Sequence, residues 1–123
     1  MSANSAPGFK THPRSHIQIN AARQRVRVTA GGQVIADTGE ALAMKEGSYP
    51  MVYYIPRKDV KMDRLVRTTH STHCPFKGDA SYFSLKDGAE NAVWSYEQPY
   101  DEMMAIKSYL AFYPDRVDSI EVD

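Results

Sequence analysis

A single cysteine is the most restrictive feature of this 123-residue sequence. Cys74 has no partner for an intramolecular disulfide, and one thiol is too few for the thiolate sites that hold structural zinc. The four histidines match no metal-ligand spacing, so we expect neither a metal nor another cofactor. Stability must then come from a packed core, and a chain of this length is expected to form one domain.

Long apolar runs and an excess of charge of one sign are also missing. No segment approaches the roughly 20 apolar residues of a membrane span, and the first residues lack the apolar stretch of a secretory signal. We therefore expect a cytoplasmic protein without a membrane partner. Five basic residues precede the first acid, Asp37, but they are too dispersed for a basic patch, and the net charge is zero. These features disfavour nucleic-acid binding.

The pattern predicts a mainly β domain over residues 16–123, preceded by a flexible lead-in over residues 1–15. Short alternating or β-branched segments between Gly, Pro and Asp are typical of antiparallel strands. We expect a loop at 70–79 and the only helix at 100–109, with Met103, Met104 and Ile106 in the core. The expected strands are 25–29, 33–37, 41–46, 51–55, 65–69, 80–85, 92–96 and 117–122.

The segment around Cys74 is the first candidate site. His73 precedes it directly, His70 lies four residues before it, and Lys77 follows three residues after it. A cation near a thiol favours the nucleophilic thiolate, so Cys74 assisted by His70 or His73 is one hypothesis for a catalytic site. The competing interpretation is a small buried cysteine before a Pro-Phe-Lys-Gly turn, because a nucleophile and a base adjacent in sequence rarely face one another.

Aromatic and basic residues supply a second candidate site. Strand alternation places neighbouring Tyr53 and Tyr54 on opposite faces and Trp94 and Tyr96 on the same face. Arg57 could bind an anionic group, although an internal salt bridge is the more common outcome for such a residue. We expect a cleft for a small anionic or aromatic ligand; its predicted lining residues are Tyr54, Arg57, Lys77, Tyr82 and Trp94. The alternative for the rings is an aromatic ladder in the core.

Three long strings carry a resemblance to a known family. They are YPMVYYIPRKDV (49–60), THCPFKGDASYFSL (72–85) and AVWSYEQPYDEMMAIKSYLAFYPDRVD (92–118), preceded by the strand pair VRVTAGGQVIADT. From about residue 12 onward the sequence resembles the bacterial family catalogued as domain of unknown function 427, also labelled nucleotidyltransferase-like.

The resemblance implies a β-tent (Mss4-like) fold, with two packed antiparallel sheets and one short helix near the C-terminus. Methionine-R-sulfoxide reductases and several zinc-binding domains share this fold, and they pin the sheets with two Cys-x-x-Cys pairs. A chain with one cysteine looks like a zinc-free version, and it lacks the motif of the reductases.

The nucleotidyltransferase label has no support in the residues. A Gly-Ser turn followed by paired acids would be needed to hold Mg²⁺ between phosphates. The only Glu-x-Asp is 121–123, without a Gly-Ser before it, and the sequence has no P-loop or Gly-x-Gly-x-x-Gly motif. Three hypotheses remain: a small-molecule binding module, which we favour, an enzyme that uses Cys74, and a homodimer with tyrosines in its interface.

Overall fold

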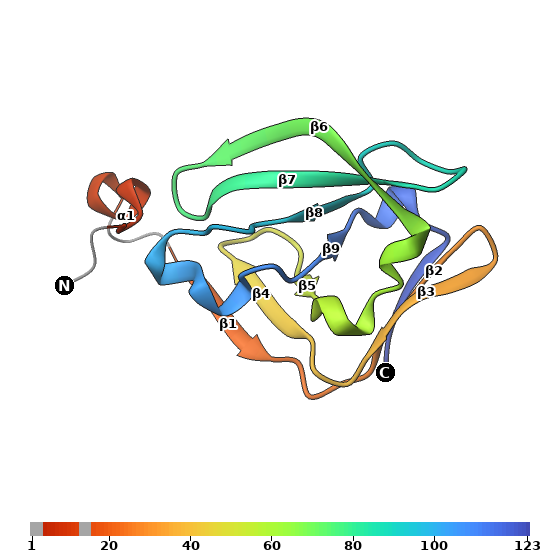
Figure 1. Ribbon diagram of the computed structural model, residues 1–123. Coiled ribbons are helices and arrows are strands. Elements are labelled where there is room, and N and C mark those ends of the chain that lie inside the picture. Colours follow the sequence, from red (N-terminus) through yellow and green to blue (C-terminus); the bar gives the residue numbers. More distant parts are fainter. Residues whose placement is uncertain (1–3, 13–15) are drawn as a thin grey trace.

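The computed structural model describes residues 4–12 and 16–123, and the fold is mainly β, as the sequence predicts (Figure 1). Within the described residues the strands form three antiparallel sheets, where the sequence analysis expected two. One sheet has the order β1-β4-β5 and comprises Ile17–Ala21, Leu42–Glu46 and Val52–Tyr54. The second has the order β10-β2-β3 and comprises Ser119–Val122, Val26–Ala30 and Gln33–Thr38. The third has the order β6-β7-β8-β9 and comprises Leu65–Cys74, Gly78–Leu85, Val93–Ser95 and Ala111–Phe112.

The inner strands of the third sheet, β7 and β8, send side chains into a core on each face. Alternate side chains of a strand point to opposite faces, and here neighbours in sequence enter different clusters. Phe83 and Val93 belong to an aliphatic core, together with Val26 and Val28 of β2. Tyr82 and its cross-strand partner Trp94 belong to an aromatic cluster on the other face. The sheet therefore separates two cores of different chemistry.

An isolated bridge joins the first and third sheets. The backbone amide of Ile55 donates to the carbonyl of Leu110 at 2.8 Å, and the amide of Leu110 donates back at 2.9 Å. Both side chains are fully buried, Ile55 just after β5 and Leu110 just before β9. This bridge fixes the position of Tyr54 relative to the aromatic face of the third sheet.

The predicted loop at 70–79 is wrong except at residues 75–77, because β7 already begins at Gly78. Strand β6 continues to Cys74 and pairs with β7, with a register shift between Arg67 and Ser71. It lies at the edge of the sheet, and most of its side chains are exposed. An exposed edge strand needs no alternating apolar residues. The threonines, histidines and serines of this segment therefore lack the pattern from which a strand is predicted.

The predicted helix at 100–109 is a shorter 3₁₀ segment, η3 (Asp101–Ile106), with non-helical geometry at Met103. Residues three apart lie on the same side of a 3₁₀-helix. Met103 and Ile106 are therefore both buried, as predicted, but Met104 is 47% exposed, so its assignment to the core is wrong. The other 3₁₀ segments are η1 (Arg57–Asp59), η2 (Met62–Arg64) and η4 (Pro114–Arg116).

Residues 4–12 contain a short helix, α1 (Pro7–Thr11), that packs on the β6–β7 turn. The amide of Gly8 donates to the carbonyl of Pro75 at 2.8 Å, and the rings of Phe9 and Phe76 meet edge to face at 5.0 Å. A Cβ on Gly8 would lie 2.7 Å from the Phe76 ring, so this close approach requires glycine. The rest of the predicted lead-in, 1–3 and 13–15, lies outside the described residues.

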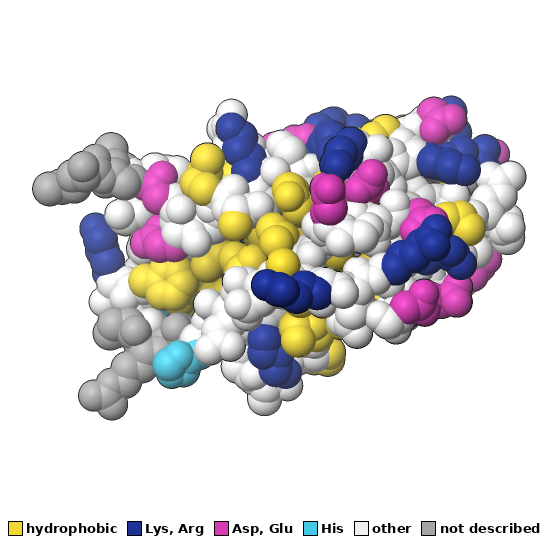
Figure 2. Space-filling view, turned by 90° about the horizontal axis from the view of Figure 1, so that it is seen from below, with side chains coloured by type: hydrophobic (Ala, Val, Ile, Leu, Met, Phe, Trp, Pro, Cys, Tyr) yellow, Lys and Arg dark blue, Asp and Glu magenta, His cyan; other side chains and the backbone are white. Residues whose placement is uncertain are grey.

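Charged side chains of both signs mix at one end of the molecule. Figure 2 shows Lys and Arg interspersed with Asp and Glu at the end that carries the β2–β3 hairpin, with hydrophobic side chains toward the other end. Arg25 and Arg27 both pair with Asp37, at 2.7 and 3.6 Å. Among the described residues, no helix has the length and apolar character needed to cross a membrane.

The bridge between the sheets yields a stability prediction. Replacing Leu110 by alanine should lower the free energy of unfolding by about 2–5 kcal/mol, because a fully buried leucine leaves a cavity. The control is Val66→Ala at a position that is 48% exposed on β6, for which we expect no more than about 1 kcal/mol. Urea denaturation of both variants measures the difference, and equal losses would contradict the assignment of Leu110 to the core.

Candidate functional site

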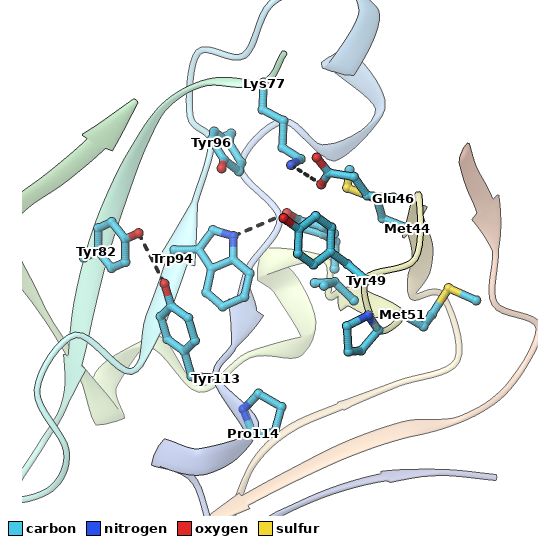
Figure 3. A pocket seen from close by; sticks show the side chains of 13 residues that line it. Met44, Glu46, Tyr49, Met51, Lys77, Tyr82, Trp94, Tyr96, Tyr113 and Pro114 are labelled. Carbon is cyan, nitrogen blue, oxygen red and sulfur yellow. Dashed lines mark hydrogen bonds and ion pairs between the residues drawn. The ribbon is translucent and has the colours of Figure 1, made fainter. Parts of the chain in front are cut away.

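A cavity of about 530 Å³ lies between the β4–β5 hairpin and the aromatic face of the third sheet (Figure 3). A volume of this size is typical of small-molecule sites. Aromatic side chains supply much of its wall: Tyr49, Tyr54, Tyr82, Trp94, Tyr96 and Tyr113. The alternation that placed Trp94 and Tyr96 on one face, and Tyr54 opposite Tyr53, is thereby confirmed.

Hydrogen bonds between the side chains hold these rings in place. The indole Nε1–H of Trp94 donates to the hydroxyl of Tyr54 at 3.3 Å, and their rings meet edge to face at 6.3 Å. The hydroxyls of Tyr82 and Tyr113 lie 3.4 Å apart, and Thr72 bonds the Tyr82 hydroxyl at 2.9 Å. The walls are therefore preorganised rather than loosely packed.

The hydroxyls of Tyr54, Tyr96 and Tyr113 remain protonated at neutral pH. Burial raises the pKa of Tyr54 and of Tyr96. Burial, helped by the hydrogen bond with Tyr82, raises the pKa of Tyr113 to about 12. These groups can donate and accept hydrogen bonds in the cavity, but a neutral phenol is a poor general base.

An ion pair lies at one end of the cavity. Lys77 Nζ is 2.7 Å from Glu46 Oε1, and the two side chains are 10% and 33% exposed. A charge this deeply buried needs a partner, and Glu46 supplies it. The pair is charge-compensated, so the lysine offers less attraction to an anionic ligand than an unpaired cation would.

The β6–β7 turn delivers Lys77 to the cavity. The amide of Lys77 donates to the carbonyl of Cys74 at 3.2 Å, and its carbonyl accepts from Tyr100 at 3.0 Å. Gly78 follows with a φ of +114°, and a Cβ there would approach the Gln98 carbonyl at 3.4 Å. A backbone angle in this range favours glycine, so the sequence Lys77-Gly78 fixes where the ammonium group points.

The β4–β5 loop forms the mouth of the cavity. Gly47 turns the chain with a φ of +53°, and the amide of Tyr49 then donates to the carbonyl of Glu46 at 2.9 Å. Lys45 Nζ donates to the Tyr49 carbonyl. The Tyr49 side chain, 69% exposed, and Met51, 46% exposed, line this opening. Exposed apolar side chains at the mouth of a cavity are typical of a ligand entrance.

Four of the five predicted ligand residues come together in the cavity, and Arg57 does not. Its guanidinium lies over the ring of Phe83 at 5.6 Å, on the aliphatic side of the sheet. It donates to the Ser108 carbonyl at 3.1 Å and to Glu97 at 3.0 Å. Arg67 binds the same carboxylate oxygen at 2.6 Å. The internal salt bridge, the alternative reading of Arg57, is therefore what the structure contains.

The three predicted catalytic residues do not converge. Cys74 packs beside the aromatic cluster with its Sγ 4.0 Å from Lys77 Nζ. His73 must point to the opposite face of β6, where its Nδ1 is 2.7 Å from Asp79. The ring of His70 meets that of Tyr82 edge to face, with centroids 4.5 Å apart, and His70 lies roughly 13 Å along the strand from Cys74. Neither imidazole is therefore positioned to take a proton from the thiol.

Sequence reasoning missed Glu46 and Tyr113 as members of the site. Glu46 ends β4 opposite Ile17 of β1, and its contact with Lys77 depends on a turn 31 residues away. Tyr113 follows β9 directly. No local signal marks either residue, and the only general signal is the number of tyrosines, eight in 123 residues.

Residues 18–123 match the family described as "Domain of unknown function (DUF427)". The chain belongs to this family. No curated protein matches the sequence. Within the part of this DUF427 chain that the structure describes, no group of three or more His, Cys, Asp or Glu side chains is arranged to hold a metal ion.

The placement of Cys74 gives a chemical test. Iodoacetamide should modify Cys74 more slowly in the folded protein than in denaturant, because the thiol is half-buried beside the aromatic cluster. His73→Ala should leave the folded-state rate unchanged, since His73 lies on the other face of β6. Mass spectrometry of timed samples measures both rates. Rapid folded-state labelling that depends on His73 would restore the nucleophile hypothesis.

The carboxylate held by two arginines predicts a pH effect. The hydrogen bond from Arg67, with the nearby charge of Arg57, lowers the pKa of Glu97. A lowered folded-state pKa stabilises the protein above the unfolded value of about 4.3, and the stabilisation disappears as pH falls through the folded value.

Glu97→Gln should therefore lower the free energy of unfolding by about 0.5–1 kcal/mol at pH 7. The loss should vanish at a pH low enough to protonate Glu97 in both the folded and the unfolded protein. Urea denaturation in a series of buffers from pH 7 downward, as far as the protein stays folded, measures how this loss declines, with exposed Glu121→Gln as the control. A loss that stays the same size throughout the series would contradict the charge-based explanation.

Proposed function

We propose that this protein is a small-molecule binding module whose cavity takes a ligand with an aromatic ring and a neutral polar group. The observation that supports the proposal is the cavity of about 530 Å³ with aromatic walls and one buried ion pair. Binding sites combine mostly apolar walls with a few polar groups that set orientation. The cavity has both components on one side of a rigid sheet.

The walls favour a ring. The ring centroids of Trp94 and Tyr113 lie 4.5 Å apart, and the ring planes are tilted by 43°. The ring planes of Tyr54 and Trp94 are nearly perpendicular. Aromatic groups prefer offset-stacked or edge-to-face neighbours, and such pairs add to the gain from burial. A planar ligand can meet ring faces and ring edges together in this arrangement.

The ion pair favours a neutral group that both donates and accepts hydrogen bonds. A carboxamide can accept from the Lys77 ammonium and donate to the Glu46 carboxylate without breaking their contact. An anionic group would meet Lys77 but would also be repelled by Glu46 at the same end of the cavity. With Arg57 bound to Glu97, the anionic ligand expected from the sequence loses much of its support.

Benzamide is a suitable first probe, because it joins a ring to such a group. We expect it to bind with a Kd on the order of 1 mM, to change the fluorescence of Trp94, the sole tryptophan, and to raise the melting temperature. Benzoate and benzylamine, of the same shape but charged, should bind more weakly. Tyr49→Ala removes an exposed wall and should weaken binding, whereas Met104→Ala, exposed on η3 and outside the cavity lining, should not.

Glu46→Gln tests the role of the ion pair. Without the carboxylate, Lys77 becomes an unpaired cation, so the preference should shift from benzamide toward benzoate by about tenfold or more. Glu121→Gln is the matched control on an exposed strand position. Circular dichroism checks that each variant folds. An unchanged preference would show that the ion pair does not contact the ligand, and no response to any of the three probes would count against the proposal.

The finer architecture is also a proposal. We infer that the sheets β1-β4-β5 and β6-β7-β8-β9 are the two sides of a β-tent, joined by the Ile55–Leu110 bridge. The antiparallel order of both sheets and the cavity at their open side support this assignment. An experimental structure that superposes on a β-tent domain over both sheets would bear it out.

A further inference from the structure

A second cavity adjoins the first. It has a volume of about 240 Å³ and lies between β2, β5, β9 and β10. Both cavities share the wall residues Met51, Val52, Trp94 and Pro114. Figure 3 shows the polar pair Lys77 and Glu46 at one end of the first cavity and Pro114 with Met51 at the other. The second cavity therefore continues from the end opposite the ion pair.

The two cavities differ in chemistry. The first offers tyrosine hydroxyls and the ion pair. The second is lined by apolar side chains apart from the phenol of Tyr53, with Val26, Val28, Ile55 and Phe112 from the aliphatic core. Hydrocarbon groups fill apolar cavities favourably, because water in such a cavity would lose hydrogen bonds that the apolar lining cannot replace.

We propose that the ligand is amphipathic: a polar group at Lys77 and Glu46, an aromatic ring beside Trp94, and an aliphatic tail in the second cavity. The inference rests on the proposed function, since the tail reaches the second cavity only from a ring bound in the first. The occupant of the apolar cavity is thus part of the same small molecule. Trp94 lies where ring and tail join, because this residue lines both cavities.

A series of para-alkyl benzamides with methyl, ethyl, propyl, butyl and hexyl tails tests the proposal. Each added methylene should tighten binding by about fourfold until the second cavity is full, after which the gain should stop. Trp94 fluorescence and the melting temperature give the Kd values. A rise that continues without a limit would indicate non-specific adsorption and would overturn the inference.

Variants of Val122 locate the tail. Val122 is half-buried on β10 and lines only the second of these two cavities. Val122→Phe should abolish the gain with chain length while leaving the Kd of benzamide itself unchanged. Val122→Ala, which enlarges the cavity, should move the optimum to a longer tail. Val66→Phe, exposed on β6, is the control for adding a phenyl ring elsewhere.

The outcomes separate the two proposals. Binding of benzamide with no dependence on chain length, or equal dependence in the wild type and in Val122→Phe, would overturn the amphipathic ligand and leave the binding module standing. No binding by any member of the series would overturn both. Should Val122→Phe fail to fold, Ile120→Phe on the same strand narrows the same cavity, and Val122→Ala still tests the optimum.

Discussion

The arrangement of this molecule depends on two strands, β7 and β8, that are packed on both faces. One face packs against aliphatic side chains, and the other packs against aromatic rings. Along β7 and β8 one side chain of each neighbouring pair enters the aliphatic core and the other enters the aromatic cluster, as Phe83 and Tyr82 do. Aliphatic chains interdigitate closely. Rigid rings joined by hydrogen bonds, such as Trp94 to Tyr54, enclose space between them. The cavity that holds the ion pair lies on the aromatic side, and the aliphatic side anchors the sheet that supports it.

The same sheet separates two polar clusters, and in each of them a carboxylate is paired with one or more basic side chains. On the aliphatic side Glu97 lies between Arg57 and Arg67, and on the aromatic side Lys77 meets Glu46. In both clusters an acid compensates the cation, because a charge held close to an apolar core is costly alone. Basic residues that suggest anion binding in the sequence are thus largely used inside the fold. In the binding module that we propose, selectivity would then depend on hydrogen-bond geometry rather than on net charge.

Sequence patterns predicted the elements whose side chains face a core. Residues 51–55, 80–85 and 92–96 alternate or are largely apolar because side chains on both faces enter a core. This alternation correctly placed Tyr54 opposite Tyr53, and Trp94 on the same face as Tyr96. Strand β6 was half missed because its side chains face solvent. Glu46 joined the site only through the register of β4 and a distant turn. Arg57 follows Pro56, beyond the strand, where alternation no longer tells which face a side chain takes.

The chemistry of the cavity suits holding a molecule better than transforming it. Burial keeps the tyrosine hydroxyls protonated, Glu46 is engaged by Lys77, and both histidines near Cys74 point elsewhere. General acid–base or nucleophilic catalysis needs a group whose proton or electron pair is free to move. Tyr54 and Tyr96 are held by burial and Glu46 by its ion pair. In the binding module that we propose, these groups form a gradient in polarity, from the ion pair through the rings to the apolar cavity beyond Trp94, and this gradient would orient the ligand.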